Sequence, residues 1–426
     1  MTKQATWKAV RWGIVALLFV ITVINYLDRQ SLSLLAPTIQ KQLKMNDESY
    51  AHIVTAFLVA YTIAYVLAGR ITDWLGTRKS MVLFVTWWSI SEMIPPFART
   101  ARMLGFGRFM LGLGEAGNYV VAPKAISERF GPAERGTAIG IYTAGATIGA
   151  TLAPLLVASL SSRYGWPSVF FVTGGIGLLW IPPWLLLYKR ATGIPRMNEE
   201  PLQRISESAE KRSVWAAVFR RRTTWYLLIA RFLTDPVWYF YLFWYPKYMV
   251  QARQLTVTRV GYIIWTVYLA ADVGTLVGGY LSGRLIRKGA APLSARRKVM
   301  TFAACVMPLG PLAALLPSIT PAVSIAALIA FTHMAWLVTL SALLVDEYPT
   351  SQVATAAGLV AAGSGLGGIL STELIGWVVM HSGYIPVFMA MGVLHLAALF
   401  FLWKIREFRA EPNGHAMAHQ KAMVTQ

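Results

Sequence analysis

Two pairs of oppositely charged residues stand inside long apolar stretches of this chain. Asp28 and Arg29 are adjacent in one stretch, and Arg108 and Glu115 are seven residues apart, on one helix face, in another. An arginine offers a planar fork of donors that matches a carboxylate, and a carboxylate that loses its cationic partner takes up a proton more readily. The four residues predict a site for an organic anion on Arg29 and Arg108, with Asp28 and Glu115 carrying a proton. The alternative is that the arginines form structural ion pairs with these acids.

The stretches that hold these residues are long enough to cross a membrane. Of the 426 residues, 56% are hydrophobic and 14% are charged, against about 25% charged in an average soluble protein. A bilayer-spanning helix needs about 20 apolar residues. We expect twelve spans, at residues 11–35, 50–72, 79–98, 101–124, 137–160, 168–188, 224–249, 260–283, 298–317, 321–345, 353–378 and 384–403.

One long polar segment divides the spans six and six. Residues 189–223 hold nine Lys or Arg and four Glu. We therefore expect an N-terminal six-helix half at 1–188, a cytoplasmic linker at 189–223, a C-terminal six-helix half at 224–410 and a cytoplasmic tail at 411–426.

The formal net charge of +20 fits this organisation. In a soluble chain it would indicate nucleic acid, but in a membrane chain it indicates cytoplasmic loops. With both termini inside, the inner segments carry 27 Lys or Arg and the outer loops carry eight, as the positive-inside rule requires. The remaining four lie in or at the ends of spans: Arg29, Arg70, Arg108 and Arg231. We expect a multi-pass protein whose partner is the lipid bilayer, with no nucleic acid.

The two halves repeat each other at an offset of 218 residues. At this offset Phe130 aligns with Tyr348. In the same register four glycines align with four others: Gly140, Gly145, Gly149 and Gly165 with Gly358, Gly363, Gly367 and Gly383. Six helices separate the copies, so the halves have the same orientation in the membrane. Small residues at this spacing allow helix backbones to approach closely.

The loop after the second span resembles the signature loop of the major facilitator superfamily. It reads Gly69-Arg-Ile-Thr-Asp73-Trp-Leu-Gly76-Thr-Arg78-Lys79. The resemblance implies an all-α, 12-helix membrane fold of two parallel six-helix halves with both termini cytoplasmic. We expect Gly69, Asp73, Gly76 and Arg78 to form a conformational latch, in which Asp73 caps a neighbouring helix and pairs with an arginine. Arg135 is the candidate partner.

Within that superfamily the chain resembles the anion:cation symporter family over nearly its full length. The segments that carry this resemblance are Asn25-Tyr26-Leu27-Asp28-Arg29, Tyr61-Thr62 and Arg108 to Glu115. Residues 231–238 and 271–274 look most like the hexuronate transporter branch, whose known members import galacturonate and glucuronate with protons. Asp28 is closer to the pattern of aldonate and glucarate carriers, so these anions stay open. The resemblance implies the cell inner (plasma) membrane, and we expect a monomer.

Sugar acids also need hydrogen bonds to their hydroxyls and an aromatic surface for the ring. Tyr26, Tyr61, Trp238 and Trp336 are the candidates, and Tyr26 and Tyr61 match the pattern of the family. Most of the 16 Trp and 18 Tyr must instead belong to interface belts or to packing.

Other charged residues in the spans have no assigned transport role. Arg231 and Asp235 are four residues apart and could satisfy each other. Glu92 is expected near the membrane interface. The roles of Asp272 and Glu373 stay open.

A membrane enzyme, a channel and a receptor are the rival classes. The six histidines show no metal-binding spacing inside a span and no phosphate-binding glycine loop is present, so we expect no metal, no cofactor and no enzyme. A channel or receptor explains neither the parallel repeat nor the paired charges. The sequence predicts a secondary transporter that imports a hexuronate such as galacturonate or glucuronate with protons, by alternating access. The alternatives are an aldonate such as galactonate, or glucarate or galactarate.

Overall fold

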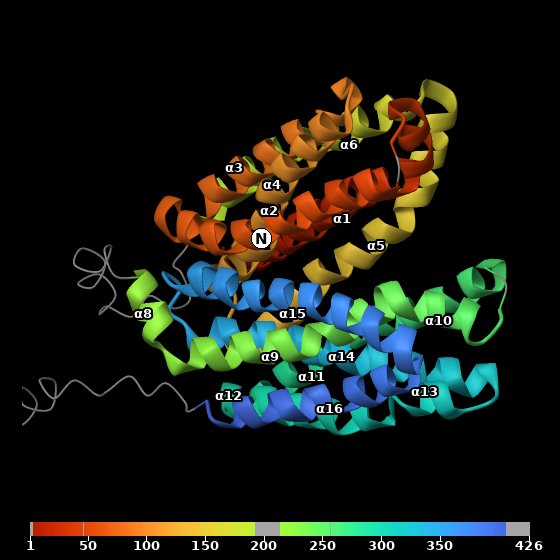
Figure 1. The fold of residues 1–426 in the computed structure, drawn as a ribbon. Coiled ribbons are helices and arrows are strands. Elements are labelled where there is room, and N and C mark those ends of the chain that lie inside the picture. Colours follow the sequence, from red (N-terminus) through yellow and green to blue (C-terminus); the bar gives the residue numbers. More distant parts are fainter. Residues whose placement is uncertain (1–2, 46, 192–213, 256, 406–426) are drawn as a thin grey trace, which may run out of the picture.

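The computed structural model describes residues 3–45, 47–191, 214–255 and 257–405, and their regular structure is helical (Figure 1). The N-terminal half consists of α1 (Lys3–Leu43), α2 (Asp47–Leu75), α3 (Thr77–Glu92), the short turn η1 (Pro95–Phe97), α4 (Ala101–Arg129), α5 (Pro132–Tyr164) and α6 (Trp166–Ala191). The described ranges leave out most of the predicted linker and all of the predicted tail.

The C-terminal half begins with the short helix α8 (Val214–Arg220) and is more broken. Its first span consists of α9 (Arg222–Tyr239), the π-helical turn η2 (Phe240–Trp244) and α10 (Tyr245–Gln251). Then follow α11 (Val257–Arg287), α12 (Pro292–Val306), η3 (Met307–Leu309), α13 (Leu312–Leu315), α14 (Ile319–Glu347), α15 (Val353–Ser382) and α16 (Ile385–Trp403). The predicted 12-helix, two-half architecture is confirmed, with the spans at 224–249 and 298–317 each built from several short helical pieces.

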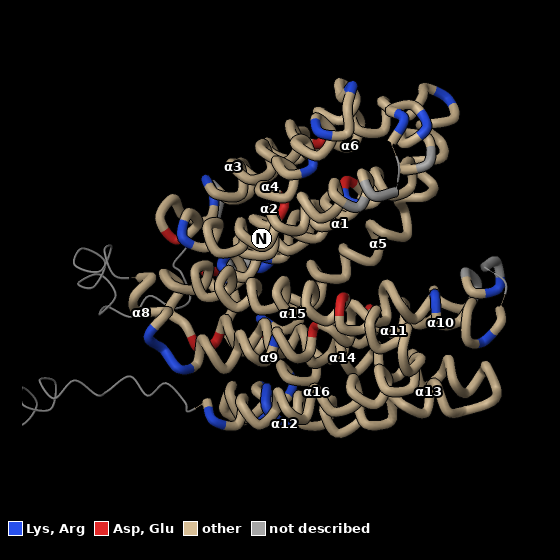
Figure 2. Tube along the Cα trace, viewed as in Figure 1, with Lys and Arg blue, Asp and Glu red and all other residues tan. Residues whose placement is uncertain are grey.

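Nine of the described helical stretches are long and apolar enough to cross a membrane, judged by length and composition only. The spans on α3, α4 and α9 fall outside this group. All three carry buried charge: α3 ends on Glu92, α4 holds Arg108 and Glu115, and α9 holds Arg231 and Asp235. Charged groups in a span are costly in lipid and usually face the bundle interior. Lys and Arg otherwise gather toward the two ends of the molecule (Figure 2).

The internal repeat is also a repeat of packing. A Cβ atom added at Gly145 of α5 would lie 2.6 Å from the carbonyl oxygen of Phe19 in α1, and one added at Gly363 of α15 would lie 2.6 Å from that of Leu228 in α9. Both helices also end on a glycine with positive φ, 79° at Gly165 and 75° at position 383, which L side chains rarely adopt. The same glycines therefore dock α5 on α1 and α15 on α9.

The two halves touch at the end of the molecule that carries the α2–α3 loop and α8. A Cβ atom added at Gly69 would lie 2.6 Å from the carbonyl oxygen of Ala354, and one added at Gly136 would lie 2.7 Å from that of Gly279. Toward the end that carries α10 and α13 the halves diverge (Figure 1). The contact end, which we call the closed end, is the one that the charge pattern predicts to be cytoplasmic.

Candidate functional site

Arg29 of α1 lies at the centre of the N-terminal half, where it pairs with Glu115 of α4. Its Nη2 donates to Glu115 Oε2 at 2.8 Å and its Nε donates to the same oxygen at 3.2 Å. The Glu115 side chain is fully buried, whereas 26% of the Arg29 side chain is exposed. The arginine is therefore anchored on its protein side and open on the other.

Aromatic rings surround this guanidinium. Its carbon lies 4.9 Å from the ring centre of Tyr26, 5.3 Å from that of Phe57 and 4.7 Å from that of Tyr61. Such cation–π contacts hold the guanidinium in place without using all its hydrogen-bond donors. The structure thus brings Arg29, Tyr26, Tyr61 and Glu115 together, from three helices.

Arg108 occupies a different environment, because only 3% of its surface is exposed. Its Nη1 donates to Glu92 Oε2 at 3.3 Å and to the backbone oxygen of Asp28 at 3.4 Å. Glu92, which was expected near the membrane interface, is fully buried within the protein at the end of α3, and its depth in the membrane stays a prediction. The reason is charge, because a buried arginine needs a buried carboxylate partner, and Glu92 supplies it.

Asp28 is fully buried, and neither of its carboxylate oxygens accepts a hydrogen bond from any described residue. Its charged neighbours are Glu115 and Arg108, and the Thr173 hydroxyl also faces it. The site therefore holds three carboxylates, with Glu92 the third, against two arginines. When all are ionised the cluster has an excess of one negative charge.

The two tryptophan candidates lie apart from Arg29, in the C-terminal half. Trp238 is half-buried and its ring lies parallel to that of His333, with 6.1 Å between ring centres. Trp336 is fully buried against His395. Their predicted contact with substrate stays a prediction, and in this structure Trp336 packs in the core.

Sequence reasoning missed a buried pair of histidines beside these tryptophans. His333 Nδ1 of α14 and His395 Nε2 of α16 are 3.1 Å apart. The two residues are 62 positions apart, so no local spacing signals the pair. Among the described residues no group of three or more His, Cys, Asp or Glu could hold a metal ion.

Arg231 and Asp235 of α9 form the predicted i, i+4 ion pair, with Arg231 Nη2 2.8 Å from Asp235 Oδ2. The Arg231 side chain is 18% exposed and that of Asp235 is 7% exposed. Asp272 of α11 is partly buried near Thr147 of α5, and Glu373 of α15 is exposed. Arg231 is thus a second intramembrane arginine whose guanidinium is partly open.

Asp73 of the signature loop joins the halves at the closed end. Its Oδ2 accepts hydrogen bonds from the backbone N and the side-chain Oγ1 of Thr355, in the first turn of α15, the former at 2.7 Å. Its Oδ1 accepts from Lys124 Nζ at 2.7 Å. The expected cap on a neighbouring helix is present.

The prediction that Asp73 pairs with Arg135 is wrong. Arg135, at the start of α5, instead donates to Asp346 Oδ1 at the end of α14, at 2.8 Å. Asp346 Oδ2 also accepts from Arg296 Nε at 3.1 Å. Asp73 is already neutralised by Lys124, so Arg135 pairs with the carboxylate that the other half presents. Arg135 thus belongs to a second bridge between the halves.

The remaining loop residues have structural roles at the closed end. Gly76 is the N-cap of α3 with φ 79°, and Arg78 Nη2 donates to the backbone oxygen of Leu185 at 3.3 Å. Sequence reasoning missed Lys124, Arg296 and Asp346. The internal repeat contained one sign of this site, because the offset of 218 residues aligns Asp346 with another acidic residue, Glu128.

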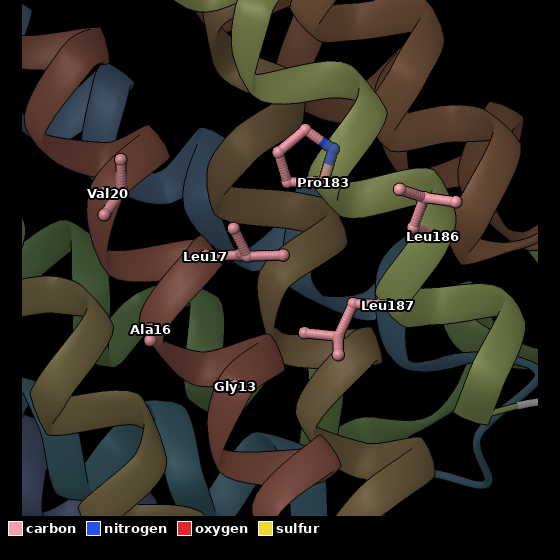
Figure 3. Close-up of a pocket in the computed structure, with 7 residues that line it drawn as sticks. All are labelled: Gly13, Ala16, Leu17, Val20, Pro183, Leu186 and Leu187. Carbon is pink, nitrogen blue, oxygen red and sulfur yellow. The ribbon is translucent and has the colours of Figure 1, made fainter.

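A groove of about 410 Å³ lies between α1 and α6 (Figure 3). The residues that line it are aliphatic, glycine or proline, among them Gly13, Leu17, Pro183 and Leu187. With no charged group among them, this groove does not fit an anion site.

Named transporters resemble this chain over most of its length. It is 28% identical to the hexuronate transporter of Escherichia coli K12 over 408 residues, which are 93% of this chain and 94% of that protein. It is 29% identical to the galacturonate transporter of Dickeya chrysanthemi, over 71% of this chain and 90% of that protein. A probable galactarate/D-glucarate transporter of Bacillus subtilis is 29% identical over 72% of each chain.

Solved structures share the fold at lower identity. A proton:xylose symporter of the major facilitator superfamily superimposes with a TM-score of 0.71 at 14% identity, over 93% of this chain and 96% of that one. The sequence pattern of the Major Facilitator Superfamily matches residues 18–330. The predicted fold, the multi-pass inner-membrane location and the assignment to a transporter family rather than an enzyme class agree with these matches. The chain belongs to the major facilitator superfamily.

Proposed function

We propose that this protein imports a sugar-acid anion, a hexuronate such as galacturonate or glucuronate, together with a proton, by alternating access. The observation that carries the proposal is Arg29: its guanidinium is partly exposed, ringed by tyrosines and anchored by a buried carboxylate. An arginine at membrane depth that is open on one side fits a carboxylate ligand. The surrounding tyrosines supply hydroxyls and ring faces for a polyhydroxylated substrate.

The charge balance supports coupling to protons. Asp28, Glu92 and Glu115 exceed Arg29 and Arg108 by one negative charge in a buried region. An unpaired ionised carboxylate costs several kcal/mol there, so one proton on the cluster makes it neutral. A substrate carboxylate on Arg29 would displace Glu115, which then needs a proton of its own. Anion and proton each make the other easier to bind, which is the linkage that symport requires.

The contacts at the closed end support alternating access. Asp73 binds Thr355, and Arg135 binds Asp346, across the two halves. In our proposal these bridges keep the predicted cytoplasmic end shut while substrate enters from the other side, and they break when the halves rock. The site and both bridges lie within one chain, so we propose that a monomer is sufficient.

The choice of a hexuronate rests on the relatives. The relative from Escherichia coli K12, which matches 93% of this chain, is named a hexuronate transporter, and the relative from Dickeya chrysanthemi is named a galacturonate transporter. Aldarates are the second candidate, because a relative named for galactarate and D-glucarate covers 72% of the chain. A competition panel of uronates, aldonates and aldarates separates these classes.

The test is uptake of labelled galacturonate into proteoliposomes that contain the purified full-length protein. We expect accumulation when the outside is more acidic than the lumen, and equilibration without accumulation when the gradient is collapsed. Accumulation that ignores the proton gradient would refute symport. If no uronate, aldonate or aldarate competes with the labelled substrate, the proposed substrate class is refuted.

A further inference from the structure

The C-terminal half presents its own partly open arginine, Arg231, and this one is locked to a carboxylate of the same helix. Arg231 Nη2 lies 2.8 Å from Asp235 Oδ2, one turn away on α9. The second carboxylate oxygen of Asp235 and the Nε of Arg231 are buried and hydrogen-bond to no described residue. The hydroxyls of Ser364 and Thr234 lie near the Asp235 carboxylate, so the surroundings of the pair are polar.

This ion pair faces the N-terminal half. Tyr65 of α2 and Tyr142 of α5 are within electrostatic reach of Arg231. Tyr65 is also within reach of Arg29, and its hydroxyl donates to the Tyr61 hydroxyl at 3.0 Å. Tyr61 in turn packs on Arg29. The two partly open arginines thus stand on opposite halves, with the Tyr61–Tyr65 pair between them.

Further hydroxyls surround Asp235 on the C-terminal side. Tyr239, one turn along α9, has its hydroxyl 3.3 Å from Ser364 Oγ of α15, and both lie near Asp235. The ring of Tyr239 packs closely over Gly368 of α15, where a Cβ atom would lie 2.5 Å from it. The side chains around the pair are therefore fixed by packing and polar at their tips.

The charges on the two halves differ in balance. The cluster around Arg29 has three carboxylates for two arginines, whereas Arg231 has one carboxylate partner within bonding distance. A one-to-one pair is neutral as it stands and needs no proton to stay buried. It offers no net charge to a second carboxylate, but it offers a donor and an acceptor to hydroxyl groups.

We infer that the Arg231–Asp235 pair is the hydroxyl-recognition subsite for the end of the sugar acid opposite its carboxylate. The inference rests on the proposed function, in which Arg29 holds the carboxylate. In a hexuronate ring C2 lies directly across from C5, which bears the carboxylate, so the C2 hydroxyl and a neighbouring hydroxyl on C1 or C3 can donate to Asp235 and accept from Arg231. A substrate held on both halves also links them, so binding at this pair helps the halves close together.

The test measures selectivity at C2 by competition against counterflow of labelled glucuronate in proteoliposomes. The probes are unlabelled glucuronate and its C2 epimer, mannuronate. We compare the unaltered protein with the double variant Arg231→Met/Asp235→Leu, which removes both charges and so leaves no unpaired buried charge. The variant loses charged hydrogen bonds to a substrate hydroxyl. The concentration of unlabelled glucuronate that halves counterflow should therefore rise roughly 10-fold or more. The preference for glucuronate over mannuronate should shrink toward unity.

The matched control is Arg11→Met, which removes the partner of Glu134 in another partly exposed ion pair, one that lies outside the site. It should leave the ratio of the two competitors unchanged. Unchanged C2 selectivity in the double variant, with counterflow still measurable, would overturn the inference while leaving the proposed function intact. If the unaltered protein moves no uronate at all, the proposed function fails instead. A double variant that does not fold is replaced by Arg231→Gln/Asp235→Asn, which also removes both charges and keeps the side-chain volumes, and for which a smaller loss of C2 selectivity is expected.

Discussion

Arg29 and Glu115 are 86 residues apart in the sequence and form an ion pair of 2.8 Å in the interior of the N-terminal half. The carboxylate is fully buried and the guanidinium is one-quarter exposed. A ligand carboxylate that reaches Arg29 therefore competes with Glu115 for the same donors. This competition is the simplest physical link between anion binding and protonation in the molecule.

Arg29→Lys should weaken sugar-acid binding without destroying the fold. Lysine keeps the charge and can still pair with Glu115, but it lacks the planar fork that binds a carboxylate with two hydrogen bonds. We expect the KM for uptake to rise roughly 10-fold, the value of about one charged hydrogen bond. Uptake kinetics with the protein amount normalised in the membrane measure this change, and an unaltered KM would contradict a direct contact with Arg29.

Glu92→Gln should change the coupling. Arg108 would lose its carboxylate partner, and Asp28, whose backbone oxygen it already contacts, carries the nearest unpaired carboxylate. We expect Arg108 to turn to the Asp28 side chain and hold it ionised. Counterflow should then persist while accumulation under a proton gradient falls. Glu134→Gln, in the half-exposed pair with Arg11, is the control and should keep accumulation.

Asp73→Asn should loosen the closed end. The amide is neutral and no longer neutralises Lys124 or caps α15 with an anionic oxygen, although it can still accept a hydrogen bond from Thr355. Spin labels at Trp74 and Lys288, both exposed and on opposite halves, would report this in a Cys305→Ser background. We expect the distance distribution to extend to longer values. A distribution identical to that of the unaltered protein would show that this cap does not hold the halves together.

Gly136→Ala and Gly145→Ala should have different effects although both glycines lie on α5. An added Cβ at Gly136 meets the carbonyl oxygen of Gly279 across the halves at 2.7 Å, whereas one at Gly145 meets that of Phe19 within the N-terminal half at 2.6 Å. We expect Gly136→Ala to lower transport with little change in Tm, since only the interface between halves must shift. Gly145→Ala should lower Tm of the detergent-solubilised protein by several degrees. Equal Tm losses would argue against an interface role for Gly136.

The sequence predicted what depends on local pattern and on the repeat. Apolar stretches, basic loops and the 218-residue offset gave the fold, and the i, i+4 spacing gave the pair of Arg231 with Asp235. The pairing of Glu92 with Arg108 was not predicted, because it depends on how the end of α3 packs against α4. Lys124 was missed as the partner of Asp73 for a related reason, since α2 and α4 must pack together before the two side chains meet.

The histidine pair shows the same limit. His333 and His395 meet because α14 and α16 both pack against α12, and nothing in the residues around either one encodes that contact. Tyr65 was also missed, although it follows Tyr61 by one helical turn and lies between Arg29 and Arg231. Spacing identifies residues on one helix face, whereas the groups on the facing helix are set by tertiary packing.

In the proposed mechanism, Glu115 exchanges Arg29 for a proton when the anion binds. The direct measurement is proton entry into proteoliposomes that hold a pH-sensitive dye, after addition of galacturonate outside. The unaltered protein should acidify the lumen on addition of galacturonate. Glu115→Gln should exchange labelled for unlabelled galacturonate but leave the lumen at constant pH. Galacturonate-driven acidification of equal extent in Glu115→Gln would contradict this role of Glu115.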